Sequence, residues 1–440
     1  MAANLRRLFS GRPDRKGFLA LLGRRRTQVI VFLGVLGPGL ITSVADNDAG
    51  GIFTWASAGS KYGYDLIWLL LVVTVALMVV QEFNARLGVV SGKGLADLIR
   101  ERFGVRITVL AMALLLVANV ATVIAEFAGI ALAGEAFNVP RLITVPVAAA
   151  VVWFLVLRGS YAVVEKVFLA FALVYLTYVV SGFAVHPPWG EIAHHAVMPT
   201  IHLNSEYLLL SVAIVGTTIT PWMQFYLQAS VVDKGLREDD LHYARIDVFF
   251  GSLFTDFICF FIVVATAATI YATHGSTNIA DAKDAAQALG PAAGQFAKAL
   301  FVVGLAGASM MAAAILPLST AYAVTEAFGW ERGVGATVRE APAFFTIFTG
   351  LIVVGAVTIL FPSVPLTAVT LLSQDVNGLI LPAILVFMFI LVNDRRVMGK
   401  YVNGRFANWV GGLTIGGVIL LTGLLLLSTV PGFPWVHLGG

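Results

Sequence analysis

The chain has 440 residues, of which 59% are hydrophobic and only 12% are charged, and its mean hydropathy is +0.89. Soluble domains carry about 25% charged residues, so this composition excludes a soluble globular protein and indicates one embedded in a membrane. The formal net charge of +3 comes from basic residues spread over the segments between apolar runs. That argues against nucleic-acid binding, which needs a clustered basic face.

Eleven apolar runs are long enough to cross a bilayer, which takes roughly 17 to 25 residues. They lie at 28–58, 64–90, 107–134, 140–157, 160–184, 206–230, 246–273, 293–325, 342–361, 365–393 and 408–430. Residues 1–27 are a basic tail, and we predict that residues 28–440 form one transmembrane domain. The single cysteine, Cys259, excludes an internal disulfide framework.

The distribution of basic residues predicts the orientation of these spans. Lysine and arginine are retained on the cytoplasmic side of short loops. If the N-terminus is cytoplasmic, only four of the 28 lysines and arginines fall on the opposite side: Lys61, Arg141, Lys283 and Lys298. We therefore expect a multi-pass protein of the cell membrane, with a cytoplasmic N-terminus and an extracellular or periplasmic C-terminus.

The first run is interrupted by the stretch SVADNDAGGIFTW, residues 43–55. It places Asp46, Asp48 and a pair of glycines where a transmembrane helix would cross the bilayer. An ionised Asp at that depth costs at least about 2.5 kcal/mol and is by default a functional residue with a partner. No Lys, Arg or His lies deep within the runs to supply one, so the sequence predicts a cation taken from solution.

The sixth run is interrupted as well, in VGTTITPWMQFYLQ at residues 215–228. Pro221 has no N–H to donate and disfavours helical geometry at the preceding residue. Two broken spans at corresponding places in two halves are typical of an inverted-repeat transporter with its site at the bilayer midplane. We predict repeats at 28–184 and 206–393 and an extra helix at 408–430.

The stretch GPGLITSVADNDAGGIFTWASAGSKYGYDLIW, residues 37–68, resembles the first-span region of the Nramp divalent-metal transporters, whose signature is Asp-Pro-Gly-Asn. QEFNARLGVVSGKGLADLIRERFG (81–104), AEFAGIALAG (125–134) and NDRRVMGKYVNG (393–404) extend the resemblance over nearly the whole chain. It implies an all-α membrane protein with a LeuT-like fold, eleven transmembrane helices, two inverted five-helix repeats and broken helices 1 and 6.

The resemblance also implies a metal site at the breaks. The family's metal-binding Asp falls on Asp48, but its Pro and Asn are replaced by Ala49 and Gly51, and its metal-coordinating Met is replaced by Thr220. A thioether helps to select softer ions, whereas an all-oxygen site suits Mg²⁺, which usually keeps several waters. The departures therefore favour Mg²⁺, with Mn²⁺ also carried, as in the Nramp-related magnesium transporter branch.

By carry-over and by chemistry, the expected metal ligands are Asp48, Gly51, Ala45, Thr217, Thr220, Gln374 and Asp375, and the expected accessory residues are Asp46, Glu126, Trp222 and Gln228. The ligands at Ala45 and Thr217 are backbone carbonyls. Asp375 is an added carboxylate beside Gln374. For Glu126 and Trp222, a carboxyl hydrogen-bonded between helices and a packed aromatic ring remain alternatives. Asn377 lies in the same polar stretch as Gln374, and a helix–helix hydrogen bond explains it as well as a place near the metal does.

The family's proton route is interrupted here. Its Asp in span three and its His in span six correspond to Val123 and Gln228, and neither group titrates near neutral pH. We predict uptake of Mg²⁺ or Mn²⁺ by alternating access without proton coupling, and we expect a monomer in the lipid bilayer with no cofactor and no enzymatic activity. The alternatives are a proton-coupled Mn²⁺ or Fe²⁺ transporter and a sodium-coupled amino-acid carrier of the same fold.

Overall fold

The computed structural model describes residues 38–158, 176–202, 204–279, 282–286, 288, 290, 294–333 and 337–428. Within these ranges every regular element is helical. The predicted basic tail at 1–27, the beginning of the first predicted span, residues 160–175 of the fifth span and the last residues of the extra helix lie outside the described residues.

Seven long helices form most of the bundle: α6 (Ile67–Ser91), α8 (Val105–Ala136), α15 (Leu241–Thr266), α19 (Ala297–Phe328), α20 (Pro342–Leu360), α21 (Leu366–Asn393) and α23 (Arg405–Ser428). The shorter helices α9 (Arg141–Arg158) and α11 (Leu176–Ala184) cover parts of the fourth and fifth predicted spans. By length and hydropathy, eight helices of the described chain can cross a membrane. The prediction of eleven spans is therefore neither met nor contradicted by this part of the chain.

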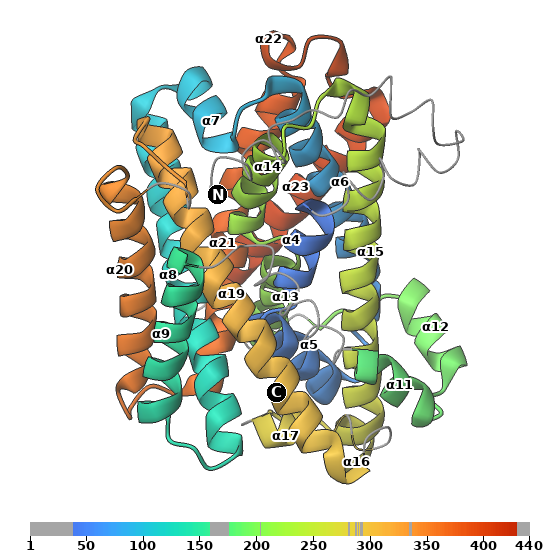
Figure 1. Cartoon of the computed structure of the whole chain (residues 1–440). Helices are drawn as coiled ribbons and strands as arrows, with labels where there is room; N and C mark the ends of the chain where they lie inside the picture. Colours follow the sequence, from blue (N-terminus) through green and yellow to red (C-terminus); the bar gives the residue numbers. More distant parts are fainter. Residues whose placement is uncertain are drawn as a thin grey trace, which may run out of the picture.

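Short elements connect the long helices at the two ends of the bundle. At one end lie α7 (Leu95–Phe103) and α22 (Arg395–Met398), and at the other lie α12 (Trp189–Val197), α16 (Ala272–His274) and α17 (Ala282–Ala286) (Figure 1). Single helical turns at Glu238–Asp240, Gly294–Phe296 and Gly399–Tyr401 complete the connections.

Both predicted breaks are confirmed. The first span consists of α4 (Pro38–Asp46) and α5 (Ala49–Tyr62), with only residues 47 and 48 between them. The sixth consists of α13 (Ser205–Thr218) and α14 (Pro221–Asp233), separated by residues 219 and 220. From α4 to α5 and from α13 to α14 the chain runs in opposite directions through the bundle (Figure 1), as inverted repeats require.

Local chemistry explains why the helices restart where they do. Asp48 is in extended geometry and its side chain accepts a hydrogen bond from the N–H of Gly51, which makes it the N-cap of α5. Pro221 is the first residue of α14, where its missing N–H would have no intrahelical acceptor in any case. Each break therefore ends at a residue that favours a new helix N-terminus.

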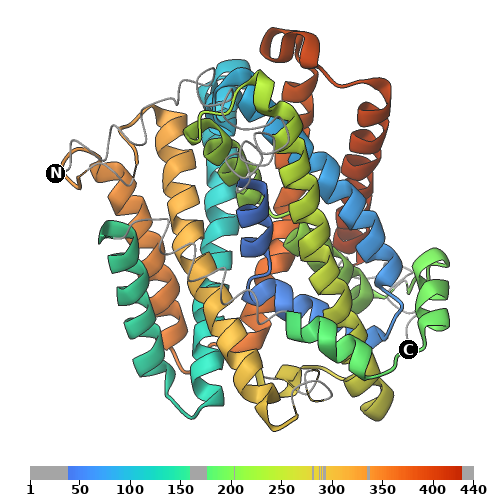
Figure 2. The ribbon, with the colours of Figure 1, turned by 45° about the vertical axis from the view of Figure 1, so that its right-hand side comes forward.

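The broken helices form the centre of the bundle. Residues 49–60 of α5 are buried without exception, and 94% of the most apolar window of α13–α14 is buried. In α23 the corresponding share is 17%, and this helix lies at the edge of the bundle (Figure 2). Helix α8 packs closely against both α19 and α21, and these three helices provide a scaffold beside the broken pair.

Helix α15 changes its winding where α5 crosses it. It continues through a π-helical turn at Ala267–Tyr271 into α16. A Cβ on Gly59 of α5 would lie 2.6 Å from the carbonyl oxygen of Val263 and 3.1 Å from the backbone nitrogen of Ala267. The two backbones approach so closely here that only glycine fits.

Candidate functional site

Asp48 is buried between the two halves of the first span, with 1% of its surface exposed. Its Oδ1 accepts a hydrogen bond of 2.7 Å from the N–H of Gly51. Its Oδ2 is buried and has no donor among the described residues. One carboxylate oxygen therefore caps the helix, while the other is left for a ligand.

Glu126 of α8 reaches the same helix N-terminus. Its Oε2 accepts a 3.3 Å hydrogen bond from the N–H of Ala49, and its Oε1 has no donor in the described part of the chain. The carboxyl groups of Glu126 and Asp48 lie close enough to interact directly. Two buried acceptors side by side require a shared proton or a cation between or beside them.

Oxygen atoms surround Gly51. A Cβ at this position would lie 3.0 Å from the carbonyl oxygen of Asp46, 3.1 Å from Oγ1 of Thr217 and 3.4 Å from Oδ1 of Asp48. The Thr217 hydroxyl is buried and has no hydrogen-bond partner among the described residues. Both breaks thus contribute oxygen atoms to one small volume, and a side chain at position 51 would intrude on it.

Helix α21 closes this volume from another side. The amide of Gln374 lies directly over Gly50, where a Cβ would overlap it. Asn377 donates hydrogen bonds to Oγ1 of Thr122 (3.1 Å) and to Oε1 of Gln374 (2.9 Å). Asn377 therefore makes the helix–helix hydrogen bond that was one of its two predicted roles, and it fixes Gln374. Asp375 next to it is buried, and its Oδ1 has no partner in the described chain.

The remaining residues of the breaks make polar and packing contacts. The hydroxyl of Thr220 donates to Oδ1 of Asp46 at 3.4 Å, which joins the two breaks. Ala45 lies in the last turn of α4, but the carbonyl oxygen that faces Gly51 is that of Asp46. The ring of Trp222 is fully buried and packs against Tyr226 at a centroid distance of 5.8 Å.

Two side chains of α14 are directed elsewhere. Gln228 donates to the carbonyl oxygen of Lys93 at 2.9 Å, two turns beyond the break, and so it is not part of the oxygen cluster. The sulfur of Met223 accepts a hydrogen bond from the amide of Gln81. This contact with α6 occupies the only thioether that follows closely on the second break, so the cluster around Gly51 consists of oxygen atoms.

Sequence reasoning missed the contribution of α15. Thr255 donates to the carbonyl oxygen of Ser43 at 2.9 Å, and the thiol of Cys259 donates to Oδ1 of Asn47 at 3.3 Å. Asp256 lies between them in sequence, is buried and interacts electrostatically with Asp46. A carboxylate within an apolar run was the available signal, but nothing in the sequence tied it to the first break.

The arrangement favours a cation. The C-terminal ends of α4 and α13 and the N-terminal ends of α5 and α14 meet at the breaks, and their partial charges are opposite in sign. The buried carboxyl groups of Asp48 and Glu126 at the N-terminus of α5 shift the balance toward a cation. Unwound carbonyls and the C-terminal ends of half-helices coordinate cations in transporters of this architecture. The described residues contain no group of three or more His, Cys, Asp or Glu side chains arranged as a metal cage. The candidate ligands are instead a mixture of carboxylate, hydroxyl and carbonyl oxygens.

The comparisons with known proteins point to one family. The family model of natural resistance-associated macrophage protein-like (Nramp) proteins matches residues 39–428. The divalent metal cation transporter MntH of Verminephrobacter eiseniae is 28% identical over 435 residues, which are 94% of this chain and 94% of that protein.

Solved structures are similar at the level of the fold. The manganese transporter of Eremococcus coleocola, in complex with an aromatic bis-isothiourea compound, has a TM-score of 0.72 at 22% identity and covers 92% of this chain and 88% of its own. The nucleobase-cation-symport-1 transporter Mhp1, closed around bromovinylhydantoin, has a TM-score of 0.57 at 15% identity over 91% and 92% of the two chains. The predicted all-α, LeuT-like fold is confirmed by these likenesses.

Proposed function

This chain belongs to the Nramp family, and we propose that it carries divalent metal cations across a membrane by alternating access. It is a transporter and not an enzyme. The ion binds between the two breaks, and the halves α4–α5 and α13–α14 move against the scaffold of α8, α19 and α21 to open the site to either side. The MntH relative, named as a divalent metal cation transporter and matched over 94% of both chains, supports this proposal.

One observation carries the proposal: both breaks bring oxygen atoms to the volume beside Gly51, and two oxygens at the breaks are buried without a hydrogen-bond donor in the described part of the chain. The Oδ2 of Asp48 and the Oγ1 of Thr217 are both buried and unpartnered. A buried polar atom without a partner costs about 1–3 kcal/mol, and more when it is charged. A doubly charged ion at this place would satisfy both atoms, and no basic side chain of the described residues does so.

For the ion itself, the first candidate is Mg²⁺, with Mn²⁺ also carried. Thr220 stands in place of a thioether and donates to Asp46, and the sulfur of Met223 is taken by Gln81. Hard oxygen ligands suit Mg²⁺, and this ion usually keeps several waters while it contacts one or two carboxylates.

The second candidate is proton-coupled transport of Mn²⁺ or Fe²⁺, and the comparisons favour it over the first. The structurally similar protein of Eremococcus coleocola is a manganese transporter by name. The adjacent carboxyl groups of Asp48 and Glu126 would provide a place for a proton that leaves when the metal arrives. Sodium-coupled amino-acid transport is not favoured, because an anionic Asp48 would repel a substrate carboxylate.

Flux measurements in proteoliposomes separate these candidates. Mg²⁺, Mn²⁺ and Ca²⁺ are supplied in parallel, with a pH dye enclosed and the membrane voltage clamped by a potassium gradient. The first candidate predicts Mg²⁺ uptake with no change of internal pH, whereas the second predicts Mn²⁺ uptake with internal acidification. Absence of uptake for all divalent ions, in protein shown to be folded, would reject metal transport altogether.

A further inference from the structure

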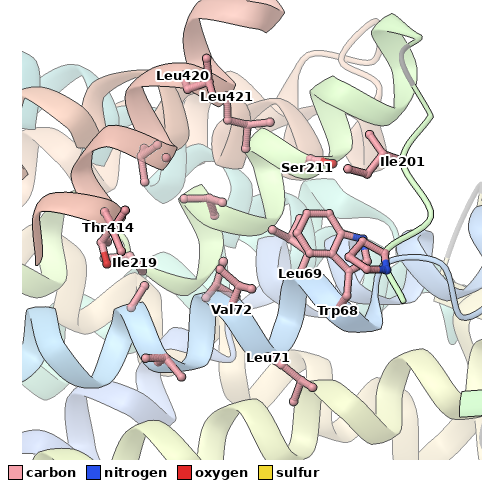
Figure 3. Close-up of a pocket in the computed structure, with 18 of the residues that line it drawn as sticks. Trp68, Leu69, Leu71, Val72, Ile201, Ser211, Ile219, Thr414, Leu420 and Leu421 are labelled. Carbon is pink, nitrogen blue, oxygen red and sulfur yellow. The ribbon is translucent and has the colours of Figure 1, made fainter. Parts of the chain in front are cut away.

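An apolar groove lies between α6, α13 and α23 (Figure 3). Its volume is about 840 Å³, which is within the range of about 300–1,000 Å³ found for pockets that hold small molecules. All three helices are among those able to cross a membrane. Most of the groove is therefore formed by transmembrane helices, and residues of α12 and of the α12–α13 connection complete one end.

The groove leads from the lipid-facing surface to the second break. Its outer walls include exposed apolar residues such as Val72 of α6 (56% exposed) and Leu413 of α23 (68% exposed). Its inner wall includes Val215 and Ile219, which are 4% and 0% exposed. Ile219 is one of the two residues between α13 and α14, so whatever fills the groove touches the break.

The lining decides what can fill the groove. A buried water needs about three hydrogen bonds to polar partners, and the lining is almost wholly apolar. An empty groove would forfeit the dispersion contacts of every atom in its walls. At this depth the groove is surrounded by the hydrocarbon of the bilayer. Lipid acyl chains can enter it from the exposed side without losing any contact with water.

Aromatic side chains mark one end of the groove as the membrane–water interface. The indole N–H of Trp68 donates to the hydroxyl of Tyr207 at 3.4 Å, and that hydroxyl donates to the carbonyl oxygen of Thr200 at 2.8 Å. Tyr62 packs edge-on against Tyr207 at 5.1 Å. Trp and Tyr are enriched at the level of the lipid headgroups. A lipid whose acyl chain enters the groove here would therefore have its headgroup beside the α12–α13 connection.

We propose that the groove binds one acyl chain of a membrane phospholipid, from the leaflet that contains the α12–α13 connection, and that this chain packs against α13 and the second break. The half-helix α13 packs against α5, so the lipid chain occupies space into which the central pair would move. The lipid is thus a structural ligand of the moving part. This effect on movement rests on the proposed transport cycle, whereas binding of the lipid does not.

Two glycines of α23 offer a matched test. A Cβ on Gly416 or on Gly417 would meet no atom within 4 Å, but only Gly417 lines the groove. We compare wild type, Gly417→Phe and Gly416→Phe, each purified with extensive detergent washing, and count phospholipids per protein by mass spectrometry. Wild type and Gly416→Phe should each retain about one phospholipid, and Gly417→Phe should retain at least five-fold less.

Equal retention in all three proteins, or no retained phospholipid in folded wild type, would overturn the proposal. If Gly417→Phe does not fold, Val72→Trp on the opposite wall takes its place with the same expectation. Metal uptake after reconstitution is measured separately. We expect it to fall several-fold in Gly417→Phe and to stay unchanged in Gly416→Phe. Failure of metal uptake in wild type would reject the proposed function and leave the lipid count valid.

Discussion

Replacing Asp48 with asparagine separates the charge of this residue from its role as a helix cap. The amide oxygen can still accept the hydrogen bond from Gly51, and the new N–H₂ can donate to the neighbouring carboxylate of Glu126. Substitution with alanine would remove the cap as well, at about 0.5–2 kcal/mol. Asp48→Asn therefore tests the negative charge alone. The difference in stability between Asp48→Asn and Asp48→Ala measures the contribution of the helix cap.

The two consequences of Asp48→Asn have opposite signs. In metal-free protein the variant replaces a buried acceptor that has no donor with an amide that can donate to Glu126, so we expect the free energy of unfolding to rise by about 1–3 kcal/mol. In the metal complex it removes one partner of a buried ion pair, which costs about 3–5 kcal/mol. At 1.4 kcal/mol per tenfold, metal binding should weaken roughly 100- to 4,000-fold.

Thermal unfolding with and without metal measures both the change in stability of the metal-free protein and the loss of metal binding. At a metal concentration of about 100 times its Kd, wild type gains about 2.7 kcal/mol, whereas a variant that binds 100-fold more weakly gains only about 0.4 kcal/mol. Uptake in proteoliposomes should fall in parallel. A variant that keeps both the metal-dependent stabilisation and the uptake of wild type would refute the assignment of Asp48 as the anionic ligand.

Three further predictions follow from the packing of the breaks. The double substitution Gly51→Asn with Thr220→Met, which restores the family's ligand types, should shift the ratio of Mn²⁺ to Mg²⁺ uptake at least tenfold toward Mn²⁺ in a competition assay; an unchanged ratio would speak against these positions as ligands. Gly216→Ala should prevent folding or lower the melting temperature strongly, because its Cβ would overlap backbone atoms of α21, whereas Gly412→Ala meets open space and should have no effect on melting. Met223→Leu should leave the ion preference unchanged, because its sulfur already contacts α6; a shift toward Mg²⁺ would place the thioether at the ion.

The sequence was sufficient to predict the breaks because their causes are local. Asp48 caps α5 through a residue three positions away, and Pro221 starts α14 by its own geometry. Both effects depend on the residue types alone. The same holds for the long apolar helices, whose lengths and compositions define them without reference to any neighbour.

The walls of the site could not be predicted in the same way, because they depend on contacts between distant segments. Nothing near Gly50 in sequence indicates that Gln374 lies over it, and nothing near Asp256 indicates that it belongs beside Asp46. The accessory role expected for Gln228 stays a prediction. Its side chain donates to the carbonyl oxygen of Lys93, a contact with the α6–α7 connection that the sequence does not indicate. The ligand assignments themselves stay predictions.

The π-helical turn at Ala267–Tyr271 in α15 has a consequence for how this chain can change over generations. Such a turn is an α-helix that has absorbed one additional residue. We expect that removing a single residue there would restore ordinary winding and leave both ends of the helix in place. Helix α5 crosses α15 at this turn through Gly59. A deletion in the turn would therefore change how α5 packs against α15 without altering any residue of the oxygen cluster.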